Sequence, residues 1–244
     1  MKILLLDIET SPNTAYVWGL FKETIPLARL IESSEVLCYS AKWLGANHVF
    51  FDSIFNSPTA LMLEGIHDLL DSADVVITYN GKNFDIPCLN KEFLGNKMSP
   101  PSPYKHIDLY QIVKNNFRFT SNKLDYVCKK LGLGEKKETT FKLWVDCMNK
   151  NPEAWKTMEE YNKHDVAILE SLYKVLQGWI KPHPNATLYT EHNEVCCPIC
   201  ASQSYQRRGY AYTSVGKYQR YQCNACGGWF RDRKNTTYKQ TLQA

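Results

Sequence analysis

The first part of the chain is dominated by short apolar runs that end in polar residues. Lys2–Ile8 is the first of these runs and reads as a buried strand. Val36–Leu44 and Val49–Phe55 predict two further strands, which a turn at residues 45–47 joins as a hairpin. The chain is therefore expected to begin with three strands in succession.

Helical periodicity begins after these strands. Apolar positions within Pro58–Leu70 recur at helical spacing, and the apolar run Asp74–Tyr79 predicts the next strand. We expect a further helix at Ile86–Leu94 and a short strand that ends at Asp108, where the carboxylate is placed to act as a cap. This order indicates an α/β fold in which helices flank a mixed β-sheet.

Two more helices are predicted before residue 181. Ser121 is placed to cap a helix with apolar residues at i, i+3, i+4 and i+7, which Gly132 ends. The longest helix is expected from Pro152 to Gln177, because proline suits the first turn of a helix. We expect a main domain at residues 1–181, a linker at 182–190 and a small domain at 191–244.

The charge of the 244-residue chain is unevenly distributed. From Lys181 onward there are nine Lys and Arg against three acidic residues, a net charge of +6, whereas the preceding residues carry −2. A basic tail favours an anionic partner such as nucleic acid. No segment approaches the roughly 18 apolar residues of a membrane span, and the first residues do not form a targeting segment. We therefore expect a cytoplasmic protein without a membrane partner.

Acidic residues follow the predicted strands. Asp7 and Glu9 end the first strand and lie on one face of it, because they are two residues apart. Asp85 comes shortly after the strand Asp74–Tyr79 and could instead cap the next helix. Converging carboxylates suit Mg²⁺ or Mn²⁺, since hard cations prefer oxygen ligands. Taken alone, the pair of Asp7 and Glu9 is more readily explained as a solvated strand end, whereas the roles of cap and metal ligand can coexist in Asp85.

On the longest helix, Tyr161 and Asp165 lie four residues apart and therefore share one helical face. The residue five before Asp165 is Glu160, and His164 lies on another face. Three motifs in this order resemble those of the DEDD exonucleases in the RNase H-like superfamily: Asp7-Ile8-Glu9, Asn80 to Asp85, and Tyr161 to Asp165. The resemblance covers about the first 180 residues. It extends to phage and bacterial members, and Tyr161 matches the tyrosine subclass.

The resemblance implies an RNase H-like fold and 3′-to-5′ exonuclease activity. The substrate would be DNA, preferably single-stranded, and the products nucleoside 5′-monophosphates. The family uses two Mg²⁺ or Mn²⁺ ions. By resemblance, Asp7 bridges both ions, Glu9 and Asp165 hold the ion that activates water, Asp85 supports the other, and Tyr161 orients the water. A location in bacterial or phage-infected host cytoplasm is also implied.

The sequence leaves other functions open. RNA could be the substrate, because none of the motifs reads the 2′-hydroxyl group. An endonuclease of the same superfamily would differ in its products, which would be internal fragments rather than mononucleotides. A non-catalytic nucleic-acid-binding scaffold would bind without turnover.

Two C-x-x-C pairs near the end of the chain have the spacing of a structural zinc site, with two tight turns that supply four thiolates. The predicted zinc ligands are Cys197, Cys200, Cys223 and Cys226. Cys196 offers an alternative C-x3-C spacing, and His192 is a weaker substitute. The segment resembles the zinc ribbons of nucleic-acid enzymes.

Cations and aromatic residues are interleaved between and after the two pairs. Such a pattern suits phosphate attraction and base stacking. The residues expected to contact nucleic acid are Asn80, Arg207, Arg208, Tyr212, Lys217, Arg220 and Arg231. Alternatively, the aromatics form the core of a small domain, and the module docks a replication or repair protein.

Overall fold

The computed structural model describes residues 1–135, 137–191 and 194–237. The chain forms two compact units that divide between Glu170 and Ser171, with Met1 grouped with the second. The predicted domain boundaries, 1–181 and 191–244 with a linker between them, stay a prediction.

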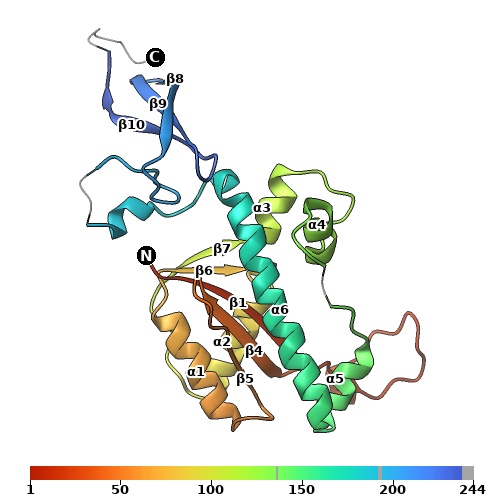
Figure 1. Ribbon diagram of the computed structural model, residues 1–244. Coiled ribbons are helices and arrows are strands. Elements are labelled where there is room, and N and C mark those ends of the chain that lie inside the picture. Colours follow the sequence, from red (N-terminus) through yellow and green to blue (C-terminus); the bar gives the residue numbers. More distant parts are fainter. Residues whose placement is uncertain (136, 192–193, 238–244) are drawn as a thin grey trace. The chain divides into compact units, whose positions relative to one another are not determined.

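The first unit is built on a five-stranded sheet (Figure 1). The central strand β1 runs antiparallel to β4 and parallel to β6, so the predicted mixed sheet is confirmed. All five strands lie where the apolar runs predict them, within a few residues at each end. Their order across the sheet is β5 (Phe50–Ser53), β4 (Val36–Trp43), β1 (Ile3–Thr10), β6 (Val75–Thr78) and β7 (Lys105–Asp108).

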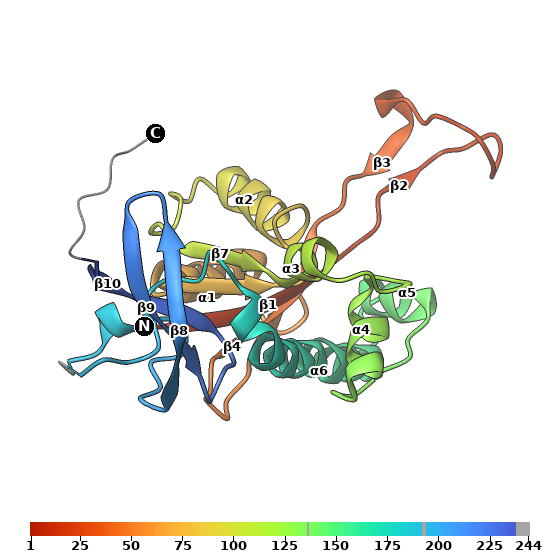
Figure 2. The same ribbon diagram turned by 90° about the horizontal axis from the view of Figure 1, so that it is seen from above.

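Helices cover both faces of this sheet. One face packs against α1 (Thr59–Asp71) and α2 (Asp85–Gly95) through a cluster that includes Leu6, Leu63 and Leu89. On the other face, β4 contributes to a second cluster with α5 (Phe141–Met148) and α6 (Pro152–Leu176). Figure 2 shows α2 and α6 on opposite sides of the sheet.

The two layers follow from the alternation of side chains along β1. Leu4, Leu6 and Ile8 belong to the cluster formed with α1 and α2. Successive side chains of a strand point to opposite faces. Asp7 and Glu9 therefore point to the face that α5 and α6 cover.

Three parts of this unit differ from the sequence-based expectations. An arm of residues 11–35, with the short strands β2 (Thr14–Ala15) and β3 (Leu30–Glu32), leaves the sheet between β1 and β4. α3 (Leu109–Asn116) and α5 are additional helices of eight residues each, which were not predicted from the sequence. The prediction that Ser121 caps α4 (Leu124–Leu131) is wrong, since the N-cap is Lys123 and the Ser121 hydroxyl accepts from its backbone N–H.

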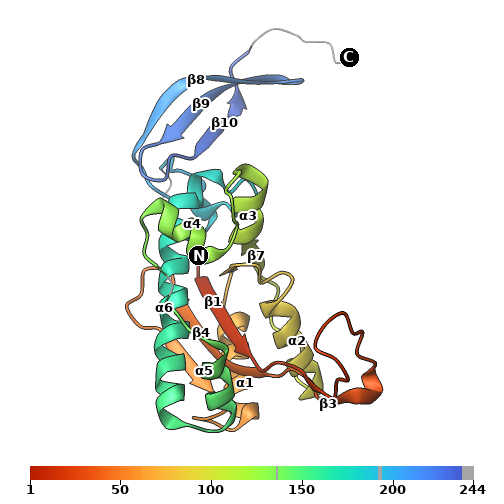
Figure 3. The same ribbon diagram turned by 90° about the vertical axis from the view of Figure 1, so that its right-hand side faces the viewer.

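The second unit contains the end of α6 and a three-stranded antiparallel sheet (Figure 3). Its strands are β8 (Tyr205–Thr213), β9 (Gly216–Cys223) and β10 (Trp229–Asn235), with β9 in the centre. The predicted linker includes a short 3-10 helix, Ala186–Tyr189, where the Asn185 side chain accepts from the N–H of Thr187.

Within the described residues, no helix is both long enough and apolar enough to cross a membrane.

The core of the first unit generates a stability prediction. Leu63 is fully buried between α1 and the sheet, whereas Leu61 on the same helix is 56% exposed. Leu63→Ala is expected to lower the free energy of unfolding by about 2–5 kcal/mol, because it leaves a cavity. Leu61→Ala serves as the control and should change it by less than about 0.5 kcal/mol. Equal midpoints in urea for the two variants would contradict this packing of α1 on the sheet.

Candidate functional site

Three carboxylates meet between β1 and α6. Asp7 and Glu9 come from the end of β1, and Asp165 comes from α6, where it is buried. One ligand oxygen from each lies within 4.8 Å of the others. Oxygens bound to one Mg²⁺ at about 2.1 Å lie at most about 4.2 Å apart, so this grouping is comparable in size to the ligand set of a divalent ion. We refer to these three residues as the acid cluster.

The longest helix brings a fourth side chain to the acid cluster. The side-chain amide of Asn162 donates to Asp7 Oδ2 at 2.6 Å, although the two residues are 155 positions apart in sequence. Asn162 is fully buried, so its amide is fixed by its surroundings. Asn162 is not among the site residues predicted from the sequence. Its spacing of three from Asp165, on the same helical face, was the available signal.

Asp85 lies at the first residue of α2 and is buried. Its Oδ1 accepts from the backbone N–H of Ile8 at 3.2 Å. The carboxylate is therefore held against β1 between the two acids of that strand, although it lies outside the group of three whose oxygens converge. The N-cap of α2 is Phe84, so the alternative role of Asp85 as the cap is not observed.

Asp108 organises the loop that carries Asn80. As the sequence predicts, it acts as a cap, with its Oδ1 accepting from Tyr110 N at 3.0 Å at the start of α3. The same carboxylate accepts from Asn80 N at 2.8 Å and from Lys82 N at 3.2 Å. Asn80 adopts a left-handed backbone conformation with φ of 69°, which asparagine tolerates better than most residues. Asp108 thus fixes the segment between β6 and Asp85.

A hollow of about 550 Å³ opens beside this loop. Asn80 and Tyr79 contribute to its wall from the end of β6, and Asn122 and Lys123 contribute from the start of α4. The hydroxyl of Tyr79 donates to the backbone carbonyl of Asn122, so the two sides of the hollow are joined. Its lining combines aromatic rings with amide and charged groups.

Tyr161 lies one helical turn before Asp165 and is buried. Its ring meets the ring of Trp144 from α5 edge to face, with centroids 5.9 Å apart. The side chains of Tyr161 and Asp165 therefore share the face of α6 that meets the sheet, as the spacing of four predicts.

Cys38 is buried on β4 opposite Glu9. Burial, and then the charges of Glu9 and Asp7, raise the pKa of its thiol well above the ordinary value. The thiol therefore stays neutral and packs as a small apolar group.

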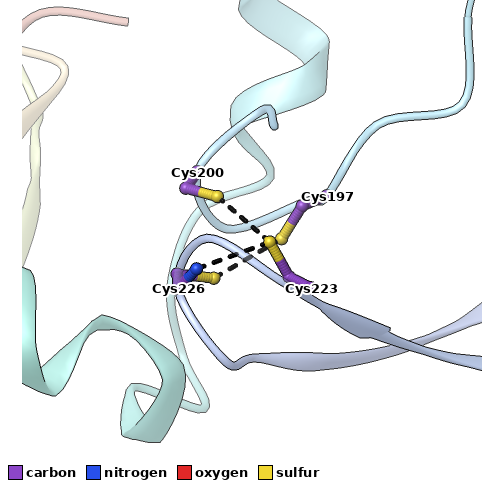
Figure 4. A group of neighbouring side chains, drawn as sticks. All are labelled: Cys197, Cys200, Cys223 and Cys226. Carbon is purple, nitrogen blue, oxygen red and sulfur yellow. Dashed lines mark hydrogen bonds between the residues drawn. The ribbon is translucent and has the colours of Figure 1, made fainter. Parts of the chain in front are cut away.

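The four predicted zinc ligands gather in the second unit (Figure 4). Cys197 Sγ lies 3.7 Å from Cys226 Sγ, and Cys200 Sγ lies 3.6 Å from Cys223 Sγ. Sulfurs bound tetrahedrally at about 2.3 Å from zinc lie about 3.8 Å apart. These two separations match a single zinc ion, and all four sulfurs lie within 4.8 Å of one another. We refer to them as the sulfur cluster.

The backbone around Cys223 suits a thiolate ligand. The N–H groups of Ala225 and Cys226 donate to Cys223 Sγ at 3.3 and 3.5 Å. Burial alone would raise the pKa of Cys223, but these backbone donors, together with hydrogen bonds to the thiols of Cys200 and Cys226, lower it to about 7. Gly227 has φ of +72°, and a Cβ on Gly228 would lie 2.4 Å from Ile199 Cδ1. The left-handed backbone at Gly227 therefore favours glycine where the chain turns away from the cluster, and a side chain at residue 228 would displace the Ile199 side chain.

The competing ligands differ in their positions. Cys196 directs its Sγ to the backbone carbonyl of Glu194 at 3.4 Å, whereas the adjacent Cys197 joins the cluster. His192, the weaker alternative, lies outside the described residues.

The three-stranded sheet separates its aromatics onto two faces. Tyr205, Tyr221 and Phe230 pack together on one face and form its small core. On the other face, Arg220 and Arg231 lie directly opposite each other on neighbouring strands.

Aromatic rings accompany both of these exposed arginines. Arg220 lies over Trp229 at 4.9 Å from the ring centroid, and Arg231 lies over Tyr218 at 4.0 Å. Like charges directly opposite each other are destabilising. This face is therefore suited to an anion.

The other expected nucleic-acid contacts lie on the same sheet. Lys217 is half-buried over Tyr210, with its ammonium 3.9 Å from the ring centroid and 5.8 Å from that of Tyr212. Arg207 and Arg208 are exposed on β8. Asn80 belongs to the first unit, where it lines the hollow at the end of β6.

Comparison with known proteins gives a family and a fold. Residues 4–177 match the model of a family described as the RNase_H superfamily. No curated protein matches the sequence. Among solved structures, the chain is similar to the family B DNA polymerase from the hyperthermophilic archaeon Pyrobaculum calidifontis, with a TM-score of 0.53 and 19% identity. The match covers 72% of this chain and 24% of that polymerase chain.

The sulfur cluster generates a prediction about metal content. Cys223→Ser is expected to reduce bound zinc from about one equivalent to almost none, since a structural site needs four protein ligands. Cys196→Ser is the matched control and should keep its zinc. Metal analysis of the purified proteins checks both. Zinc loss in the control together with retention in Cys223→Ser would show that the ligand set is wrong.

The contact of Asn162 with Asp7 generates a second prediction. Asn162→Ala is expected to weaken Mn²⁺ binding about 10–100-fold, because a neighbouring group that orients a metal ligand typically contributes this much. Calorimetric titration measures the affinity, and thermal unfolding shows whether the variant is folded. Asn96→Ala, which removes an exposed amide that bonds within α2, is the control. Unchanged Mn²⁺ affinity in a folded Asn162→Ala protein would remove Asn162 from the site.

Proposed function

We propose that this chain, which belongs to the RNase H superfamily through residues 4–177, is a metal-dependent 3′-to-5′ exonuclease of the tyrosine subclass. The observation that carries the proposal is the acid cluster, in which carboxylate oxygens from β1 and α6 lie within 4.8 Å of one another. Asp85 lies against the same strand through its bond to Ile8 N. The four acids and Tyr161 stand in the order of the motifs of that subclass.

Asp7, Glu9 and Asp165 would hold Mg²⁺ or Mn²⁺, with Asp85 contributing to a second ion. When bound, the ions lower the pKa of the attacking water and offset the charge that grows on the phosphate and on the leaving 3′ oxygen.

The protein's own side chains position the reacting groups. Asn162 holds the Asp7 carboxylate in one orientation through its amide. The Ile8 N–H does the same for Asp85. Tyr161, on the helical face that carries Asp165, would orient the attacking water with its phenol. Buried ligands with fixed partners do not need to reorganise during the reaction.

The hollow beside Asn80 supports a nucleotide substrate. Its rings, Tyr79 and Tyr110, lie edge to face with centroids 5.9 Å apart, and Lys123 supplies a cation. A base can contact the rings while a polar group of the nucleotide meets the Asn80 amide. We infer single-stranded DNA as the preferred substrate and nucleoside 5′-monophosphates as the products.

The basic sheet of the second unit supports a nucleic-acid contact outside the acid cluster. Arg220 and Arg231 face each other with aromatic rings beside them, and the aromatic packing of the small core lies on the opposite face. Two adjacent guanidinium groups suit a phosphodiester backbone, and the flanking rings suit bases. We assign this face to nucleic-acid binding. By strand register, Arg207, Tyr212 and Lys217 lie on the face that carries Tyr221, so we propose them, with Arg208, as separate contacts on the same sheet.

Replacement of one acid tests the proposed activity. Asp165→Asn is expected to reduce cleavage of 5′-labelled single-stranded DNA at least about a hundredfold, because it removes a charged metal ligand. Glu160→Gln is the matched control on the same helix, since Glu160 is exposed and pairs with Lys137. The wild-type protein and the control should shorten the DNA from its 3′ end in Mg²⁺ or Mn²⁺, and not in chelator.

Other product patterns would contradict parts of this proposal. Internal fragments would indicate an endonuclease, and faster cleavage of a matched RNA would change the substrate. An Asp165→Asn protein as active as the control would contradict the assignment of the acid cluster as the catalytic metal site. Binding without turnover in every divalent metal would leave a non-catalytic scaffold.

A further inference from the structure

The arm, residues 11–35, begins at the acid cluster. β1 ends at Thr10, the residue after Glu9, and the chain returns to the sheet as β4, which pairs with β1. Figures 2 and 3 show the arm extending away from the central sheet. Any nucleic-acid strand bound at the acid cluster therefore lies next to the root of the arm, which we define as the residues where the arm leaves the sheet.

Hydrogen bonds from backbone N–H groups fix the root of the arm. The N–H of Ser11 donates to the carbonyl of Glu35 at 2.9 Å, and the N–H of Glu35 donates to Ser11 Oγ at 2.9 Å. The N–H of Ser34 donates to Asn13 Oδ1 at 2.8 Å. These bonds join the two sides of the arm where it leaves the sheet, so the arm has a defined base.

A carboxylate organises the outer part of the arm. Glu23 accepts from Gly19 N at 2.9 Å and from Trp18 N at 3.1 Å, and it forms an ion pair with Arg29. The bond from Gly19 is the largest cause of a lowered pKa for Glu23, to which the Arg29 guanidinium also contributes. Glu23 is therefore ionised at neutral pH. Polar contacts, rather than apolar packing, shape this part of the chain.

The large apolar side chains of the arm are left exposed. Trp18 is 90% exposed and Phe21 is 88% exposed. Contiguous exposed apolar surface on a folded protein marks a place where something binds. The other large apolar residues exposed on the arm are Tyr16, Val17, Leu20, Ile25, Leu27 and Ile31.

The arm also carries a hollow that could hold part of a ligand. Its volume is about 330 Å³, and it is lined by Tyr16, Val17, Trp18 and Arg29. The Arg29 charge is offset by Glu23, and the arm as a whole carries two basic and three acidic residues, a net charge of −1. A phosphate is not favoured there. The hollow instead fits a flat, uncharged ring, since unpaired bases stack on aromatic rings and on guanidinium planes.

We propose that the arm holds an unpaired nucleobase of the strand whose phosphodiester lies at the acid cluster, stacked against Tyr16 and Trp18. The inference rests on the proposed nuclease function, because that function places a nucleic acid at the root of the arm. In this proposal the arm contacts a base, and the acid cluster binds the phosphate through its metal ions. The contribution of the arm to affinity is therefore independent of salt.

Binding by the full chain tests this inference. Tyr16→Ala/Trp18→Ala is expected to raise the Kd for a single-stranded 20-mer about tenfold in Ca²⁺, the size of effect typical for loss of one stacked base. The slope of log Kd against log salt should not change, because no phosphate contact is lost. Trp18→Phe should restore most of the affinity, and Leu94→Ala, exposed on α2, is the surface control.

Oligonucleotides with one abasic position identify the contact. Scanning that position along the 20-mer should weaken binding by the wild-type protein about tenfold at one position, and the double variant should be insensitive there. A flat scan, or an unchanged Kd for the double variant, overturns the inference. A wild-type dimer that the double variant converts to monomers in sedimentation also overturns it, since a second copy then covers the arm.

Bis(p-nitrophenyl) phosphate, a small phosphodiester without a base, separates this inference from the proposed function. The wild-type protein and the double variant should hydrolyse it at the same rate in Mn²⁺. If the wild-type protein cleaves neither this compound nor DNA, the proposed function fails, while the binding measurements still decide the role of the arm.

Discussion

The main constraint on the first unit is that it must hold together three carboxylates that repel one another. Oxygens of Asp7, Glu9 and Asp165 within 4.8 Å are unfavourable without a cation, and nothing in the local sequence compels them to meet. The fold imposes the meeting through β1. Alternate residues of this strand anchor it in the core formed with α1 and α2, which directs the acids between them toward α6. The apolar packing of one face thus supports the chemistry of the other.

The same principle extends to the groups around the acids. Asn162 fixes Asp7, the N–H of Ile8 fixes Asp85, and Asp108 fixes the backbone of the loop that leads to Asp85. Each of these partners is itself part of a packed strand or helix. A site built this way is rigid before any ligand arrives, which suits a reaction that depends on position and electrostatics. The arm contrasts with it, because its large apolar side chains are exposed and polar contacts rather than packing hold its backbone.

The second unit meets a different physical requirement. Three strands with one aromatic cluster provide little core, so the sulfur cluster fits the role of a structural cross-link in a domain of this size. Because Tyr205, Tyr221 and Phe230 supply the packing on one face, Arg220, Arg231 and their accompanying rings are not needed for it. The aromatic residues that looked interchangeable in the sequence therefore divide into a packing set and an exposed set.

The sequence by itself determined the features that depend on near neighbours. Apolar runs located all five strands of the large sheet, helical spacing put Tyr161 and Asp165 on one face, and C-x-x-C spacing selected the pairs that form the sulfur cluster. Tertiary structure decided what depends on distant segments: that Asn162 contacts Asp7 across 155 positions, that Asp85 bonds to Ile8 across 77, and that Cys197 joins the cluster while Cys196 turns away. It also revealed the arm, whose apolar residues resemble core residues in the sequence but have nothing of the described chain packed over them. The physical reason is that periodicity reports which side chains share a face, whereas the partner that face meets is set by packing between elements far apart in the chain.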